Sequence, residues 1–150
     1  MIPGFESKVS TATVEKNLLK TKSIFDFLRK NRKYMLDMTL SEYLMLLLKQ
    51  KKLKRADVVR DSGLEKAYVY QIFSGEKKPA RDKLIAIAFG LHLNSKETQR
   101  MLKLGGCSEL YVKQTRDAII MLAIHQRKDI WETDELLADN GCSTFLGQDK

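Results

Sequence analysis

The stretch from Leu53 to Leu91 carries the spacing of glycines, prolines and apolar residues that most narrows the folds open to this chain. Its apolar positions predict two short helices around a tight turn, with a third helix packed across them. Gly63 supplies the positive φ that such a turn needs. Gly75 and Pro79 mark the end of the second helix and the start of the third. The residues expected to bury the two short helices are Val59, Leu64, Val69 and Ile72.

The rest of the chain predicts further helices and no sheet. Two prolines and eight glycines in 150 residues, without alternating β-branched runs, favour an all-α fold. Capping pairs at Ser23/Asp26 and Thr39/Glu42 precede apolar residues at helical spacing. Residues 1–12 show nothing that would tie them down, and we expect them to be disordered. The helices expected before the C-terminal region are 14–22, 23–33, 40–52, 55–61, 66–73, 81–90 and 96–104.

Seven residues match, without a gap, a pattern that recurs in one family of DNA-binding domains. They are Leu53, Gly63, Leu64, Val69, Ile72, Gly75 and Pro79. The apolar face of the next helix in that pattern is matched by Leu84, Ile87, Ala88 and Leu91. Over residues 40–104 the chain therefore resembles the Xre/Cro family of phage-repressor-like helix-turn-helix domains. The resemblance implies a five-helix, lambda-repressor-like domain that binds double-stranded DNA with sequence specificity and regulates transcription.

The resemblance also implies which residues would read DNA. In such domains the second helix of the motif lies in the major groove. Here that helix is 66–73, and its base-contact candidates are Lys66, Ala67, Tyr70 and Gln71. Of the two tyrosines at 68 and 70, one is expected to close the core. The other would contact a sugar-phosphate or a thymine methyl, or anchor a protein partner.

Positive charge is concentrated on the same part of the chain. The net charge is +8, and residues 49–83 hold eleven Lys or Arg against five Asp or Glu, a local +6. Residues 1–48 sum to +3 and residues 84–150 to −1. A basic run is often only a solvated surface, but one that coincides with the motif favours nucleic-acid contact. The phosphate-contact candidates are Lys52, Lys54, Arg55, Lys77, Lys78 and Arg81.

Residues 81–110 and 116–145 are two copies of one pattern. They align without a gap at a period of 35, and ten of the thirty positions are identical. Average composition would give roughly two. The repeat predicts a C-terminal helical hairpin that echoes the last helix pair of the domain and packs against it. A tetratricopeptide-like array has a similar period, but two copies without its Trp and aromatic signature do not favour it.

Other functional classes lack their sequence signatures. There is no Walker glycine loop, H-E-x-x-H, G-x-S-x-G or dinucleotide-binding turn, so we expect neither catalysis nor a cofactor. Cys107 and Cys142 have no metal-ligand spacing and are expected to be small packing residues, and Trp131 a core or groove filler. The longest apolar run, 43–48, is too short for a bilayer. The N-terminus lacks the features of a signal peptide, so we expect a cytoplasmic location and no membrane partner.

These observations divide the chain into three segments. Residues 1–38 form an N-terminal tail with amphipathic helices, 39–106 the helix-turn-helix DNA-binding domain, and 107–150 the C-terminal hairpin and tail. The apolar face of the hairpin needs a partner surface, either in the preceding hairpin or in a second chain, and we expect a homodimer. The alternative to a transcriptional regulator is a protein-binding adaptor on the same scaffold. Its contact patch would be Glu65, Ala67 and the two tyrosines.

Overall fold

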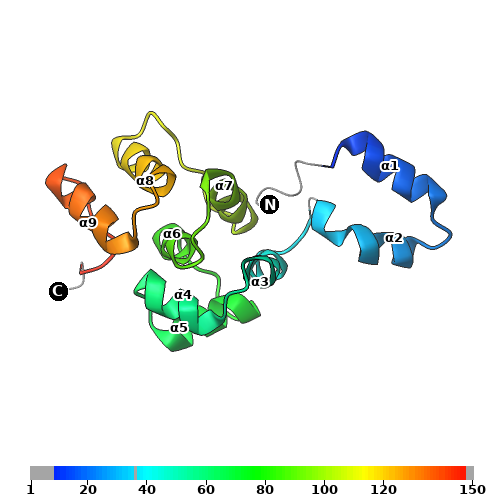
Figure 1. The fold of residues 1–150 in the computed structure, drawn as a ribbon, viewed down its shortest axis with the longest axis horizontal. Helices are drawn as coiled ribbons and strands as arrows, with labels where there is room; N and C mark the ends of the chain where they lie inside the picture. The colour runs from blue at the N-terminus through cyan, green and yellow to red at the C-terminus, as the bar shows by residue number, and fades with distance from the viewer. Residues whose placement is uncertain (1–8, 36, 148–150) are drawn as a thin grey trace.

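The computed structural model describes residues 9–35 and 37–147. These residues form nine α-helices and one short 3₁₀ helix without any strand, so the prediction of an all-α fold is confirmed. Figure 1 shows α1 and α2 at one end of the long axis and α9 at the other. From the second helix onward, the expected bounds agree with the structure to within two residues. The elements are α1 (Thr11–Lys20), α2 (Ile24–Asn31), η2 (Arg32–Tyr34), α3 (Leu40–Lys51), α4 (Arg55–Ser62), α5 (Lys66–Ser74), α6 (Arg81–Gly90), α7 (Ser95–Leu104), α8 (Thr115–His125) and α9 (Ile130–Asp139).

The first two helices form an arm, residues 11–34, which contributes little to the core. Helix α1 begins three residues earlier than expected, because the side chain of Ser10 accepts a hydrogen bond from the Thr13 N–H at 3.1 Å and caps the helix. Of the segment expected to be disordered, residues 1–8 lie outside the described residues. For residues 10–12 the expectation is wrong, because Ser10 caps α1 and residues 11 and 12 belong to its first turn. Helix α1 buries no residue, and α2 buries only Phe27 and Asn31.

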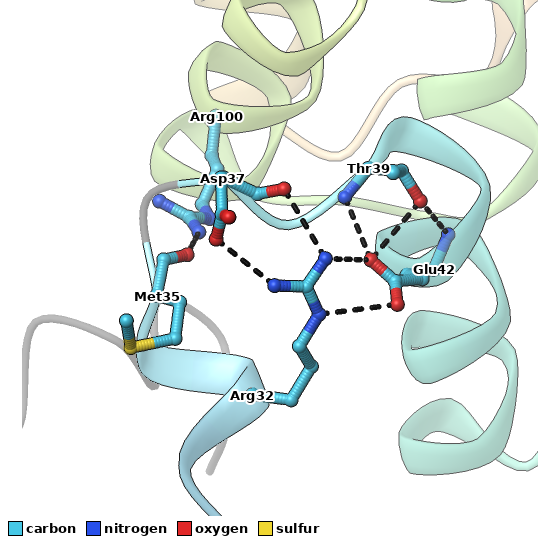
Figure 2. A network of polar contacts seen from close by, with 6 residues as sticks. All are labelled: Arg32, Met35, Asp37, Thr39, Glu42 and Arg100. Atoms are coloured by element: carbon cyan, nitrogen blue, oxygen red, sulfur yellow. Dashed lines mark hydrogen bonds and ion pairs between the residues drawn. The ribbon is translucent and has the colours of Figure 1, made fainter. Parts of the chain in front are cut away.

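Arg32 attaches the arm to the first core helix, as Figure 2 shows. Its guanidinium donates to both carboxylate oxygens of Glu42, at 3.2 and 2.9 Å, and to the Asp37 carboxylate at 2.9 Å. Glu42 also accepts from the Thr39 backbone N–H at 2.8 Å, which closes the predicted capping box of α3. The hydrogen bonds from Arg32 and Thr39 lower the pKa of Glu42 to about 2.

A second contact holds the segment between the arm and the core. Arg100 of α7 donates from Nη2 to the Met35 carbonyl oxygen at 3.4 Å (Figure 2). Met38, which follows, is buried in the main hydrophobic cluster. The arm is therefore fixed at its base, while α1 and the start of α2 project away from the other helices (Figure 1).

Helix α6 lies at the centre of the core. Every residue from Leu84 to Leu91 is buried, because α4, α7 and α9 all contact this helix. Helix α4 lies very close to Gly90 of α6, where a β-carbon would be 2.8 Å from the Val58 carbonyl oxygen. The contact with α6 decides which face of α4 turns inward. Val58 is consequently buried completely, and Val59, the residue that the sequence predicted to lie under the next helix, is only half-buried.

Helices α4 and α5 are joined by a three-residue turn. Gly63 has φ +74°, in the left-handed region that the sequence predicted for this position. The predicted inner face of α5 is present, since Val69 and Ile72 are buried together with Phe73. The hydroxyl of Ser41 in α3 donates to the Phe73 carbonyl oxygen, which fixes the end of α5 against α3.

Two hairpins with the same local geometry follow, one made of α6 and α7 and the other of α8 and α9. In each, the second helix starts with a capping box, Asn94 with Glu97 in the first hairpin and Asp129 with Glu132 in the second. The positive backbone angles also repeat at a spacing of 35: the φ values are 56° at His92, 60° at Arg127, and 73° at both Gly106 and Gly141. The sequence repeat thus corresponds to a structural repeat.

The two hairpins exchange ion pairs across their interface. Arg81 of the first donates to both carboxylate oxygens of Asp117 in the second, at 3.1 and 2.8 Å. Arg116 of the second donates to both oxygens of Asp82 in the first, at 2.9 and 3.0 Å. Helix α7 likewise contacts α8, and α6 contacts α9. Such reciprocal contacts are typical of two-fold symmetry, which here relates the two hairpins of one chain approximately.

Candidate nucleic-acid interface

Helix α5 has one face in the core and one face exposed. Its inner side buries Val69, Ile72 and Phe73, whereas Lys66, Ala67 and Tyr70 are exposed on the other side. Three of the four predicted base-contact residues are therefore accessible. The fourth, Gln71, is half-buried at the edge of the exposed face.

Two cations lie close to the ring of Tyr70. The Arg55 guanidinium lies 5.1 Å from the ring centroid and the Lys66 ammonium lies 5.7 Å from it. Both distances are within the range of a cation–π interaction, which restricts the rotamers of two long side chains. Arg55 is the first residue of α4, so the turn between α4 and α5 brings this predicted phosphate contact next to two predicted base contacts. We call Arg55, Lys66 and Tyr70 the α5 cluster.

Met45 belongs beside this cluster, and the sequence analysis missed it. Its sulfur lies 3.7 Å from Nη1 of Arg55, and the side chain is 44% exposed. The signal for it was present, because the core stripe of α3 is filled by Leu40, Tyr43, Leu44, Leu47 and Leu48. An apolar residue off that stripe is left at the surface.

The predicted phosphate-contact lysines are exposed in two loops. Lys52 is the C-cap of α3 with φ 57°, and Lys54 is the N-cap of α4. The backbone N–H of Lys54 donates to the Asp57 carboxylate at 2.9 Å. In this cap the side chain of the third helical residue accepts from the N-cap backbone, whereas a serine or threonine N-cap accepts from the backbone of the third residue. Lys77 and Lys78 lie in the loop between α5 and α6, with the ammonium of Lys78 next to Gly106 at the end of α7.

Arg81, the remaining phosphate-contact candidate, is occupied inside the fold. Besides its two bonds to Asp117, its guanidinium donates to the Ser108 carbonyl oxygen at 2.9 Å and to that of Glu109 at 3.0 Å. These bonds use Nε and both terminal nitrogens, so Arg81 connects the hairpins and we leave it out of the interface. The repeat indicated this role, because Arg81 recurs as Arg116 in a copy outside the basic block.

The two tyrosines of α5 occupy different environments. Tyr68 is half-buried and packs against the hydrophobic cluster, and this burial raises the pKa of its hydroxyl. Tyr70 is exposed within the α5 cluster. The structure therefore identifies Tyr68 as the one that closes the core and Tyr70 as the one able to contact a partner.

A hollow lies between the start of α5 and the C-terminal segment. Its volume is about 640 Å³, and Tyr68, Trp131 and Leu146 line it. Trp131 is 49% exposed, so it fills the edge of a groove rather than a core position. Cys107 and Cys142 are free, half-buried thiols beside backbone carbonyls of Gly105 and Asn140, at 3.7 and 3.8 Å.

Neither metal ligation nor comparison with other proteins adds a further assignment. The described residues contain no group of three or more His, Cys, Asp or Glu side chains that could hold a metal ion. In this part of the chain no helix is both long and apolar enough to cross a bilayer. Comparison with protein-family models, curated proteins and solved structures finds no match to this sequence.

Proposed function

We propose that this chain is a sequence-specific, double-stranded DNA-binding transcriptional regulator. In this proposal α4, the Gly63 turn and α5 act as a helix-turn-helix, within a five-helix domain of α3 to α7, and α5 enters the major groove. The observation that supports it is the α5 cluster, where Arg55 of α4 lies beside Lys66 and Tyr70 on the exposed face of α5. Exposed lysines on both sides of that face give it the charge that a DNA backbone requires.

Each of the four base-contact candidates on α5 has a chemically defined role in this proposal. Lys66 donates to guanine O6 or N7, and Gln71 offers a bidentate pair to adenine. Tyr70, which lies within cation–π distance of two cations, presents its ring edge to a thymine methyl. Ala67 is small enough to let α5 approach the base edges closely.

The backbone contacts come from residues on either side of α5. Lys52, Lys54 and Arg55 precede it, and Lys77 and Lys78 follow it. These five charges position the helix on the duplex and carry no sequence information of their own.

The first test is selection from a random duplex library, followed by fluorescence anisotropy on the selected site over a salt series. With five phosphate contacts, log K should fall against log salt with a slope of roughly −4 to −5. Lys52→Glu with Lys54→Glu should weaken binding to all duplexes alike. The matched control is Lys103→Glu with Lys113→Glu, two exposed lysines outside the basic block, which should change affinity far less. A flat salt dependence would rule out the proposal.

Sequence discrimination is tested separately. Gln71→Ala should cost about 1–3 kcal/mol on the selected site and little on random duplex. The contrary result, an unchanged ratio between the two, would remove Gln71 from base readout.

A protein-binding adaptor is the second candidate, and the exposure of Tyr70 beside Ala67 favours it. Exposed aromatic residues are frequent anchors of protein interfaces, and a fold alone does not decide between DNA and protein as partner. An adaptor would show no selected duplex, and Tyr70→Ala would abolish capture of its protein partner while Gln71→Ala left duplex affinity unchanged.

A further inference from the structure

An open groove runs between the arm and the core. It has a volume of about 730 Å³ and lies between α2 with η2 on one side and α3 on the other. Met38, Met45 and Leu46 give it an apolar floor, and Met45 is 44% exposed. An exposed apolar floor of this kind is the usual receiving surface for an amphipathic helix.

The rim of this groove is basic. Arg29, Lys30 and Lys33 contribute from the arm and Lys49 contributes from α3. Among the described residues that line the groove, the carboxylate is that of Glu42, and Arg32 already neutralises it. A segment that fits here must therefore combine an apolar stripe with negative charge.

Helix α9 exposes a face of that composition at the far end of the molecule. Trp131, Glu135 and Ala138 fall at positions i, i+4 and i+7 and are all exposed. Glu132 and Asp139 are exposed beside them. This face therefore places an aromatic anchor among three carboxylates.

The face is a property of the second hairpin alone. In α7, the equivalent helix of the first hairpin, the three positions are Lys96, Arg100 and Lys103. At these positions α7 carries three cations, whereas α9 carries one carboxylate and two uncharged side chains. Glu135 and Ala138 are exposed, and Trp131 is 49% exposed at the edge of the hollow that Tyr68 and Leu146 line. None of the three is buried within the chain.

We propose that α9 of a second copy of this chain occupies the groove between α2 and α3. The arm and α9 lie at opposite ends of the long axis (Figure 1), so the contact joins two molecules rather than two parts of one. Two chains placed antiparallel exchange the contact twice and close a two-fold dimer. The apolar floor favours this helix over a nucleic-acid backbone, and the proposal stands independently of DNA binding.

The test uses sedimentation velocity on the full chain and two charge reversals. One is Lys30→Glu with Lys49→Glu, one residue from each wall of the groove. The other is Glu135→Lys with Asp139→Lys on α9, which leaves the capping residue Glu132 intact. The control, Lys103→Glu with Lys113→Glu, has the same charge change as the groove reversal at two exposed sites elsewhere.

The native chain and the control should dimerise, and each reversal should raise the dimer Kd by at least about a hundredfold, since it places like charges opposite each other. An equimolar mixture of the two reversed chains should dimerise again, because both exchanged contacts then regain opposite charges. Circular dichroism confirms that each variant is folded.

Three results would overturn the proposal: a native chain that stays monomeric at every concentration, a dimer that either reversal leaves intact, or a mixture that does not recover. Loss of duplex affinity in the groove reversal with an unchanged dimer would assign the groove to nucleic acid instead.

Discussion

The two hairpins share their internal geometry and differ in what surrounds them. Both begin their second helix with a capping box, have left-handed residues at equivalent positions and take part in the Arg–Asp exchange. Helix α6 is nevertheless buried from Leu84 to Leu91, while the equivalent helix α8 leaves Leu122 48% exposed. The difference arises because α4 covers the outer face of α6. The two hairpins therefore share their local geometry, whereas the neighbouring helix determines how completely each one is buried.

One position shows how the outer faces diverged. Gly90 lets the Val58 carbonyl approach α6, and a side chain there would collide with α4. The equivalent residue in α8 is His125, which is exposed. Gly90 is the last residue of α6, and the absence of a side chain there permits the close contact with α4.

Removing the second hairpin is the strongest test of whether the two hairpins form one unit. Truncation after Gly106 takes away the partners of Arg81 and Asp82 and the Phe145 ring, 6.0 Å from that of Phe89. We expect a loss comparable to the whole stability of a domain this size, about 5–15 kcal/mol. Urea unfolding followed by circular dichroism measures it. A truncated chain as stable as the intact one would show that the first hairpin folds alone.

The exchanged ion pairs should differ in their contribution. Arg81→Met leaves the Asp117 side chain, 9% exposed, without its guanidinium partner and should cost about 3–5 kcal/mol. Arg116→Met leaves Asp82, which is 39% exposed and screened by water, and should cost about 1 kcal/mol or less. Equal losses of unfolding free energy would contradict the difference in environment between the hairpins.

Ile87 in α6 and Leu122 in α8 are equivalent positions of the two hairpins and differ in burial, so their substitution by alanine makes a matched comparison. Ile87→Ala opens a cavity in α6 and should cost about 2–4 kcal/mol. Leu122→Ala removes a half-exposed side chain at the equivalent position of α8 and should cost less than about 1 kcal/mol. If the dimer proposed above buries Leu122, its cost would rise with protein concentration, so both variants need measurement at several concentrations.

The last prediction concerns acid stability. Burial alone would raise the pKa of Asp117, but hydrogen bonds from Arg81 and the Tyr111 N–H hold it below its usual value. The stabilisation is therefore complete above the unfolded pKa and is lost as pH falls through the folded pKa. The slope from this group is at most about 1.4 kcal/mol per pH unit. The unfolding free energies of the native chain and Asp117→Asn should converge as pH falls from about 5 to 2.

The helices could be predicted from the sequence because their bounds depend on signals between residues close together in the chain. The capping boxes at Thr39 and Asn94, the left-handed Gly63 and the apolar spacing of α5 depend on residues a few positions apart. The bounds of most helices followed from these. The start of α1 was missed because Ser10 caps it without a glutamate or glutamine three residues later.

Contacts between distant parts of the chain were harder to predict. Basic composition grouped Arg81 with the lysines, although its partner Asp117 lies 36 residues away. The neighbourhood of Arg55, Tyr70 and Met45 joins three helices, and no periodicity within one helix reveals it. The groove between α2 and α3 depends on where Arg32 and Glu42 set the arm, which is a tertiary contact.

The exchanged Arg–Asp pairs also limit how many hairpins can join through this contact. In an open array each repeat offers an unused contact to the next one, so repeats can be added without limit. Here the arginine of each hairpin binds the aspartate of the other, Arg81 to Asp117 and Arg116 to Asp82. Both arginines and both aspartates are therefore already paired, and a third hairpin would find none of them available for this contact. A chain with one such hairpin would satisfy the same two residues only by pairing with its own copy. The two C-terminal hairpins thus correspond to a symmetric dimer of hairpins joined in one chain, in which both Arg–Asp pairs are already formed.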